Sequence, residues 1–507
     1  MLQRARRPVA SLCIALLAMN LVDCHTVTKK EAAAVIPRPD SSRTENIVGV
    51  TLKDGSEIKF DDKPRATYDA DTLRAYAGKQ PQAIPVSNLQ RVWVKTTDKG
   101  RTTLLVLGLS VGAFATLLAI AIASKESCPF VYSWDGTQFV FDGEPYGGAV
   151  SRGLERDDYS NLEHLRADAS GLYRLMVTNE VNETQYTNSM ELVVIDHNPG
   201  ARFEMDEWGR PYNVFSSIAP VSARDRSGRD LVQWLKTPDQ LIWEPMPETD
   251  STAPVREEIV LTYPKPRAAT RARLVARAGT GLWGSHMIRE MLQLRGADVK
   301  AWYAMVDNGG APRSLLRDWN VREELYVLKL DVDEAGTWHT RGLLPGGGPF
   351  LTETRVVPLD LSQVAGDSLR LRIRPPAGFW ALNSFEISYE DGDAPLAVSK
   401  VAPASARTSD DRDILADLRE ADDRYYAMPT TDDRAFVSFV APPVRPGSER
   451  TIFLHTRGYY RLHLPEQGAA DAVALRRITD VPDAAARMAA ESFAKRRMAS
   501  TKGAGSN

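Results

Sequence analysis

The sequence is poor in cysteine, with three among 507 residues: Cys13, Cys24 and Cys128. Three cysteines cannot build a disulfide-rich scaffold, and no CxxC pair is present to supply half of a zinc site. No histidine is placed to activate Cys128, so we expect this residue to be structural or disulfide-bonded rather than catalytic. A chain of this length must therefore rely on several hydrophobic cores.

Patterns of common metal and catalytic sites are also missing. The seven histidines form no HxxxH, HExxH or HxH spacing. His455 and His463 flank a predicted hairpin turn at residues 457–458 and could face each other across strands. Glu180 and Glu183 could supply paired carboxylates for acid–base chemistry. We expect both pairs to be structural or solvent-facing, so no catalytic, cofactor-binding or metal-binding residue is assigned.

The charge is nearly balanced, with 63 basic and 66 acidic residues and a formal net charge of −3. Residues of both signs are mixed along the chain, so no broad basic surface is expected. Nucleic acid is therefore excluded as a partner.

Residues 1–24 resemble an export signal, because three arginines precede a short apolar segment at residues 9–22. The segment ends in LVDC, which resembles the lipobox of bacterial lipoproteins and implies lipidation of Cys24. Asp23 stands where the family pattern has a small residue, so an ordinary signal peptide remains an alternative.

Residues 104–123 form a long uncharged apolar run, and about 20 helical residues span the roughly 30 Å core of a bilayer. We predict a membrane helix over residues 103–124. Gly108 and Gly112 form a small-xxx-small pair that would let another helix approach closely. The alternative is a buried helix of a globular core.

Residues 25–44 are polar and predicted to be a linker, and residues 45–98 to be a small β-domain. In this domain a turn should pair Val50 with Ile58 and Val48 with Phe60, which places apolar side chains on one face. The pattern GVTLKDG…IPVSNLQRVWV is similar to small, Sm-like β-domains of bacterial lipoproteins.

Residues 130–141 predict a β-hairpin with a two-residue turn at Asp135-Gly136. This turn would pair Phe130 with Phe141, Tyr132 with Phe139 and Trp134 with Thr137. Five aromatic rings would then share one face, which we expect to face the core rather than to stack on sugars.

The hairpin begins a predicted β-rich module, residues 127–250. The stretches SCPFVYSWDGTQFVFDGEPYGGA (127–149) and YRLMVTNEVNETQYTNSMELVVIDHNPG (173–200) resemble a module of uncharacterised bacterial envelope proteins. RTIFLHTRGYYRLHL (450–464) resembles the same family. The resemblance implies an exported or membrane-bound protein and carries no assigned chemistry.

Residues 255–395 predict a β-sandwich with one helical insertion at residues 285–294 and a flexible loop at residues 345–349. The run VVPLDLSQVAGDSLRLRIRPPAGFWALNSFEISY is similar to galactose-binding-like jelly rolls, some of which bind sugars. Predicted strands cover residues 259–261, 272–276, 325–330, 356–361, 369–373 and 385–389. Trp283, Trp319 and Trp380 could stack on a ligand if exposed, although core positions are the default.

Residues 396–470 are expected to add strands that complete this region, with a short helix at residues 413–425. Residues 471–507 predict a terminal helix and a disordered tail. The expected fold class is therefore mainly β: a small N-terminal β-barrel-like domain, one transmembrane-like helix, and a large sandwich or jelly-roll region.

These features indicate a non-enzymatic protein of the bacterial cell envelope that binds or scaffolds. Its expected partners are the membrane and envelope proteins or glycans, and no cofactor is expected. The alternative is a carbohydrate-active enzyme or carbohydrate-binding protein that uses loops of the sandwich. A component that couples the two sides of the membrane is a third possibility.

The side of the membrane that residues 125–507 occupy is open, because the export signal and the charges flanking residues 104–123 favour different topologies. We expect export of this part. A C-terminal tag should then be digested when protease is added to spheroplasts, whereas protection of the tag in intact spheroplasts and digestion after lysis would place it in the cytoplasm.

Overall fold

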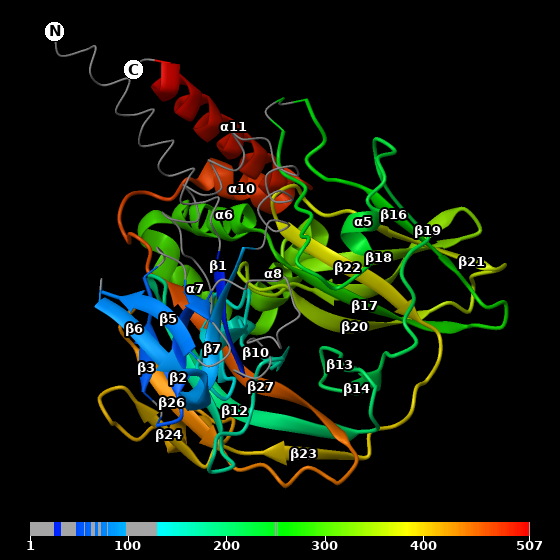
Figure 1. Cartoon of the computed structure of the whole chain (residues 1–507). Coiled ribbons are helices and arrows are strands. Elements are labelled where there is room, and N and C mark those ends of the chain that lie inside the picture. Colours follow the sequence, from blue (N-terminus) through cyan, green and yellow to red (C-terminus); the bar gives the residue numbers. More distant parts are fainter. Residues whose placement is uncertain are drawn as a thin grey trace. The chain divides into compact units, whose positions relative to one another are not determined.

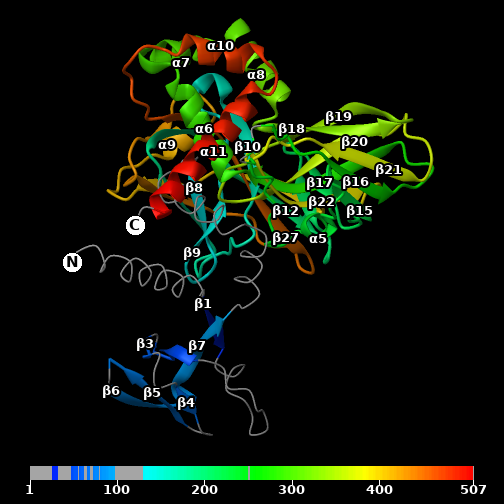
Figure 2. The same ribbon diagram turned by 90° about the horizontal axis from the view of Figure 1, so that it is seen from above.

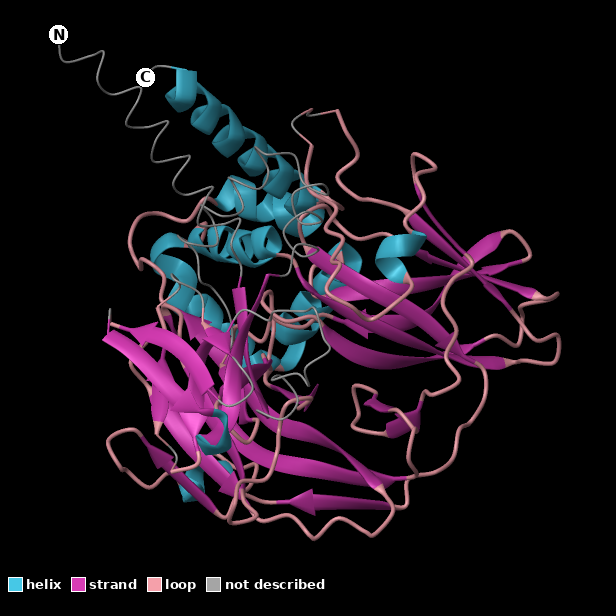
Figure 3. Ribbon diagram, viewed as in Figure 1, coloured by secondary structure: helices cyan, strands magenta, loops and turns pink. Residues whose placement is uncertain are grey.

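A computed structural model describes residues 25–31, 47–54, 56–61, 66–68, 72–78, 80–97, 129–248, 250 and 252–505. Strands make up 42% and helices 19% of the structure, so the predicted mainly-β class is confirmed (Figure 3). Cys13, Cys24, Cys128 and the apolar run at residues 104–123 lie outside the described residues. Within the described ranges, no helix combines the length and apolarity needed to cross a bilayer.

The chain divides into two compact units, residues 1–111 with 502–507, and residues 112–501. The first unit contains two antiparallel sheets around a small apolar core. One has the order β1 (His25–Glu31), β7 (Leu89–Thr97), β2 (Ile47–Leu52), β3 (Glu57–Lys59), and the other joins β4 (Thr67–Tyr68), β5 (Thr72–Ala77) and β6 (Gln80–Pro85).

The predicted pairing in this unit is confirmed. Val50 lies opposite Ile58, and the Phe60 N–H donates to the Val48 carbonyl. Residues 25–31, expected in a linker, instead form β1 along the edge of β7. The sequence HTVTKKE is polar and includes two lysines, a composition that suits the edge of a sheet.

The second unit contains two β-sandwiches (Figure 1). The first packs a five-stranded sheet against β12 and its neighbours, with Leu175 and Val177 of one sheet and Leu192 and Leu454 of the other in its core. The five-stranded sheet has the order β24 (Ser405–Thr408), β26 (Arg434–Phe439), β11 (Tyr173–Thr178), β8 (Phe130–Trp134), β9 (Phe139–Gly143). The second sheet has the order β10 (Arg156–Asn161), β27 (Glu449–Leu462), β12 (Glu183–His197), β23 (Ala397–Val401), and β25 (Tyr426–Met428) also pairs with β12.

The second sandwich lies within the sequence of the first. Its five-stranded sheet has the order β15 (Ser222–Asp225), β16 (Ile259–Pro264), β21 (Ser368–Ile373), β18 (Val327–Glu334), β19 (Thr337–Pro345). Its three-stranded sheet has the order β20 (Glu353–Asp360), β17 (Arg271–Thr280), β22 (Trp380–Ser388). A small hairpin, β13 (Phe203–Met205) with β14 (Pro211–Asn213), precedes it. All six predicted strands of this region overlap observed ones.

Helices cover one end of the second sandwich, where α6, α10 and α11 lie together in both views (Figures 1 and 2). The predicted helix at 285–294 is confirmed as α6 (Leu282–Gln293), but α7 (Val299–Asp307), α8 (Gly310–Glu323) and α10 (Ala472–Asp480) were not foreseen. The terminal helix α11 (Ala484–Gly505) continues through most of the predicted disordered tail. The helix expected at 413–425 is one turn, α9 (Leu415–Leu418).

The two sandwiches repeat one plan. The first strand of each five-stranded sheet is followed by a turn and a one-turn helix: β15 by α5 (Val232–Leu235), and β24 by α9. SARDRSGRDLVQWL (222–235) and SARTSDDRDILADL (405–418) occupy these positions. The N–H of Leu231 donates to the Ala223 carbonyl, and the N–H of Ile414 donates to the Ala406 carbonyl, in the same geometry.

A second pair of matching features supports this repeat. Asn188 in β12 and Asn383 in β22 both lie at a β-bulge, within NSME and NSFE. The Asn188 amide donates to the Asp422 carbonyl, and the Asn383 amide donates to the Asp239 carbonyl, each at the same distance in sequence beyond its one-turn helix. The first sandwich therefore combines residues 130–197 with 397–462, and its structural copy is inserted between them.

The hairpin at residues 130–141 has a different register from the predicted one. Trp134 pairs with Phe139 and Tyr132 with Phe141. The Asp135 carboxylate accepts hydrogen bonds from the N–H groups of Thr137 (2.7 Å) and Gln138 (2.8 Å), which stabilises a wider loop than the predicted two-residue turn.

The predicted role of this aromatic face is also wrong. Val131 and Ser133, on the opposite face of β8, are fully buried toward the core. The aromatic rings contact one another on the outer face, with centroids 5.3–5.6 Å apart, and apart from Phe130 they are half-buried.

Two predicted loops around glycines are in fact packed interior backbone. β27 runs without interruption through 457–458, because Gly458 allows the Tyr146 ring and the Tyr186 carbonyl to approach, rather than forming a turn. Gly346, Gly347 and Gly348, expected in a flexible loop, are buried. Glycine at these positions serves close approach of backbone to neighbouring groups.

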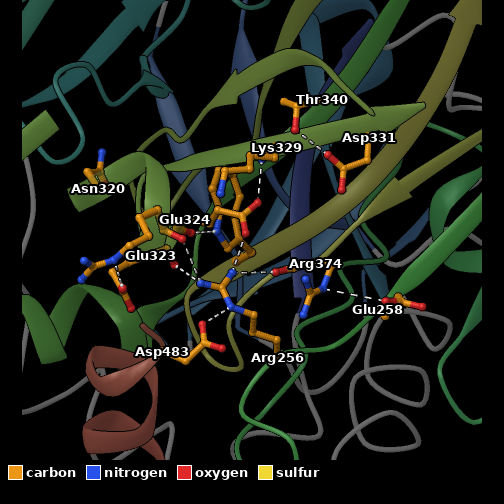
Figure 4. A network of polar contacts seen from close by, with 12 residues as sticks. Arg256, Glu258, Asn320, Glu323, Glu324, Lys329, Asp331, Thr340, Arg374 and Asp483 are labelled. Atoms are coloured by element: carbon orange, nitrogen blue, oxygen red, sulfur yellow. Dashed lines mark hydrogen bonds and ion pairs between the residues drawn. The ribbon is translucent and has the colours of Figure 1, made fainter. Parts of the chain in front are cut away.

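Arg256 connects the second sandwich with two helices (Figure 4). Its side chain, 6% exposed, donates from Nη1 to the Glu324 carboxylate (2.6 Å) at the end of α8, and from Nε to Asp483 (2.5 Å) immediately before α11. The remaining N–H groups donate to the carbonyls of Arg322, Glu323 and Arg374. A buried guanidinium with this many partners fixes the ends of both helices.

Replacing Arg256 with methionine should lower the free energy of unfolding by about 3–5 kcal/mol, because the Glu324 carboxylate would stay buried without its cation. Arg267→Met is the matched control: its side chain is 85% exposed, 3.7 Å from Asp367, and should cost less than about 1 kcal/mol. Urea unfolding followed by circular dichroism measures both. Equal losses in the two variants would contradict the role given to Arg256.

Candidate functional site

A cavity with a volume of about 860 Å³ lies in the second unit. Helices α6, α7 and α8 line one side, and β10, β20 and the loops before them line the other. A volume of this size falls in the range of small-molecule sites, roughly 300–1,000 Å³.

The helical side of the cavity is apolar. In α6, Ile288, Met291 and Leu292 share one face because residues three and four apart lie on the same side of a helix. Trp302 of α7 and Ile478 of α10 add to this wall. All five side chains are at most 9% exposed, so the wall is shielded from bulk water.

Local sequence features place α7 and α8. Asp307, at the end of α7, accepts hydrogen bonds from the Ser151 hydroxyl (2.8 Å) and the Gly153 N–H (3.0 Å), which joins the helix to the loop before β10. α8 begins after Gly309, whose φ of 78° suits glycine, and has Pro312 in its first turn.

The opposite wall contains buried charges. The Asp158 carboxylate lies between the guanidinium groups of Arg355 (2.6 Å) and Arg156 (3.3 Å), and Arg355 also contacts Glu353 (2.7 Å). The pKa of Asp158 is lowered because these two arginine charges outweigh its burial. Asp157 and Arg457 form a further pair at 3.1 Å. The pKa of Asp157 is lowered as well, first by its hydrogen bond with His455 and then by the charge of Arg457, so Asp157 and Asp158 are held ionised.

Two glycine-rich loops form the junction beside these charges. Gly147 packs directly on the backbone of Gly347, which leaves no room for a side chain at Gly147, and a side chain at Gly348 would collide with the Glu144 carboxylate. Glu144 accepts hydrogen bonds from the N–H groups of Phe350 (2.8 Å) and Leu351 (3.1 Å). The EPYGGA and PGGGP segments therefore fix each other, which explains why the latter is ordered and buried.

Apolar side chains are exposed around the cavity. Trp208 at the turn of the β13–β14 hairpin is 69% exposed, Leu315 of α8 68% and Met305 of α7 46%. Exposed apolar groups beside an apolar cavity are typical of binding sites.

One cation of the lining differs from the others. Arg295, half-buried just after α6, stacks over the Trp302 ring at 4.5 Å, and its side chain makes no hydrogen bond or ion pair with the described residues. Burial lowers its pKa to about 10, so it is still charged at neutral pH.

The predicted stacking tryptophans lie in or near the core. Trp283 and Trp380 are completely buried, and their indole N–H groups donate to the carbonyls of Ala489 and Glu324, so ligand stacking would require them to leave the core. Trp319 is half-buried, donates to the Ile478 carbonyl and lines the cavity. Cys24, Gly108 and Gly112 lie outside the described residues.

The structure separates the residues of the two weak candidate pairs. His455 and His463 do not face each other across a hairpin: His455 is within β27 and His463 follows its end. No group of three or more histidine, cysteine or acidic side chains in the described part of the chain could hold a metal ion. Glu180 accepts the Tyr132 hydroxyl at 2.6 Å, whereas Glu183 is buried.

Sequence reasoning missed the cavity, although part of its signal is visible. Val299, Trp302, Tyr303 and Val306 have the spacing of an apolar helix face and predict α7. Arg295 carries no such signal, because whether an acidic residue of the described ranges pairs with it depends on which chain segments surround it.

The chain matches no protein-family model and no curated protein. Among solved structures it is similar to a GH31 α-xylosidase from Xanthomonas citri, with 8% identity and a TM-score of 0.15, over 89% of this chain and 36% of the enzyme. The chain thus spans about a third of that enzyme's length. A similarity this weak carries no argument for fold or activity.

His455 lies beside the cavity wall as part of a carboxylate–histidine–carboxylate arrangement. Its ring is 2.7 Å from Glu191 and 2.9 Å from Asp157, and stacks on Tyr159 at 4.5 Å. Burial lowers the pKa of His455, but the hydrogen bonds and charges of Asp157 and Glu191 outweigh it, and the pKa is raised overall.

This raised pKa predicts a pH-dependent stability. The contribution of His455 is fully present below its unfolded pKa of about 6.5 and is lost as pH rises through the higher folded pKa. His455→Gln should therefore flatten the fall in the urea midpoint that wild type shows as the pH rises above about 6.5. The control His339→Gln changes an exposed histidine 4.0 Å from Glu334 and should keep the wild-type profile. If the urea midpoint of His455→Gln depends on pH as it does in wild type, this contradicts the role given to the carboxylate–histidine–carboxylate arrangement.

Proposed function

We propose that this protein is a non-enzymatic binding protein of the cell envelope, whose cavity takes an apolar or amphiphilic molecule. The observation that carries the proposal is the 860 Å³ cavity with its apolar helical wall. Burying apolar ligand surface against such a wall contributes about 25 cal/mol per Å². The predicted export signal at residues 1–24 and the apolar run at residues 104–123 support the envelope as its location.

Two of the carboxylates that line the cavity are poorly suited to hydrolysis of a glycosidic bond. A glycosidase needs one carboxyl group that holds a proton and another that is ionised, set across a cleft. Asp157 is paired with Arg457 and His455, and Asp158 with Arg156 and Arg355, so these two lining carboxylates stabilise the wall. The carbohydrate-active alternative would have to use other residues.

A charge at the entrance should impair binding. Leu315→Glu places a carboxylate among the exposed apolar side chains, and we expect roughly tenfold weaker binding of a neutral apolar probe, about 1.4 kcal/mol. The measurement is photolabelling of the full chain by a neutral alkyl diazirine, with labelled peptides of residues 282–323 quantified by mass spectrometry.

The matched control is Val440→Glu, which changes a 61% exposed valine that does not line the cavity. Both substitutions are at exposed positions and should leave stability nearly unchanged. Labelling spread evenly over the chain in wild type, or equally reduced in both variants, would contradict the proposed function.

A further inference from the structure

The arginines that line the cavity differ in whether they contact a carboxylate. Arg156, Arg355 and Arg457 each contact a carboxylate at 2.6–3.4 Å. Arg295 instead has a half-buried side chain whose Nε is enclosed without a hydrogen bond among the described residues. A desolvated cation without an acidic partner is unfavourable, and an anion brought by a ligand would compensate it.

The surroundings of Arg295 join this charge to the apolar wall. Its guanidinium lies on the ring of Trp302, which holds the group flat and leaves its edge available for the two oxygens of a carboxylate. Met291 and Leu292 belong to the turn of α6 that precedes it and also line the cavity. The cation and the apolar wall are thus continuous.

The acidic residues of the lining restrict the charge of the ligand. Glu155, Asp157, Asp206 and Glu207 all line the cavity and would repel a multiply charged anion such as a phosphate monoester. Arg317 is the second lining cation with no acidic partner in the described ranges, but it is exposed on α8. A ligand with a single negative charge therefore fits this combination of cations and acidic residues best.

Resting on the proposed function, we propose that the cavity binds a long-chain carboxylate, with the apolar chain along α6–α8 and the carboxylate on Arg295. A cation after the C-terminus of α6 also interacts favourably with the helix carbonyls. The test must therefore separate recognition of the anion from a contribution to folding.

The test compares a diazirine-bearing fatty acid with its methyl ester at pH 8, using the full chain and quantifying labelled peptides of residues 282–323. In wild type the acid should reach half-maximal labelling at a concentration at least about tenfold lower than the ester, as for other charge-assisted hydrogen bonds. Arg295→Met should remove this difference by weakening labelling by the acid at least about tenfold more than labelling by the ester, and Arg295→Lys should retain part of the difference.

Arg487→Met is the matched control, because Arg487 is an exposed arginine of α11 that does not line the cavity, and it should behave as wild type. Equal labelling by acid and ester in wild type, or equal loss of both in Arg295→Met, would overturn the carboxylate assignment while the proposed function stands. Failure of acid, ester and neutral alkyl diazirine alike to label these peptides would overturn both.

Discussion

The ion pair between Asp158 and Arg355 is the contact on which the arrangement of the two sandwiches depends. It joins β10 of one sandwich to β20 of the other, and both side chains are at most 8% exposed. Asp158 also accepts the N–H groups of Tyr146 and Tyr159, and Arg355 donates to the Tyr159 carbonyl and to Glu353. A buried pair is stable when its remaining donors and acceptors are satisfied in this way, and removing one partner leaves an uncompensated charge.

The internal repeat gives this ion pair a structural meaning. Asp158 in β10 and Arg355 in β20 occupy equivalent positions of the repeat. In the first sandwich, the residue after the bulge at Asn188 pairs with Arg457, and Arg457 pairs with Asp157. In the second, the residue after the bulge at Asn383 pairs with Arg277, and Arg277 pairs with Thr354, so the next residues, Asp158 and Arg355, correspond. The copies therefore meet through the same strand and through the glycine loop that precedes it. Opposite charges at equivalent positions allow two similar surfaces to attract each other.

The cavity is a consequence of this junction. Its lining comes from segments far apart in sequence, including residues 148–159, 288–327, 343–355 and 478–479. The inserted helices α6–α8 turn their apolar face toward the space above the junction, while β10 and β20 supply charges that satisfy one another. Arg295 is half-buried and has no acidic partner among the described residues, so the cavity combines an apolar wall with a partly desolvated cation that can meet a ligand.

The sequence by itself determined the local structure wherever a short-range pattern was sufficient. Alternation identified the strands of the second sandwich and the pairing of Val50 with Ile58, and spacing of three and four residues identified the apolar face of α6. Local patterns gave wrong predictions at some glycine and aspartate residues, because these residue types are typical of tight turns but also serve in wider loops and in close packing. The Asp135 carboxylate stabilises a wider hairpin loop than predicted, and Gly458 and Gly346–Gly348 serve close packing rather than chain reversal.

The SAR…RD repeat is visible in the sequence, but finding it requires comparison of distant segments. Only the tertiary structure decided that residues 397–462 return to the strands of 130–197, that Asp158 meets Arg355, and that no acidic side chain of the described residues pairs with Arg295, because pairing of buried charges depends on which distant segments share the same interior.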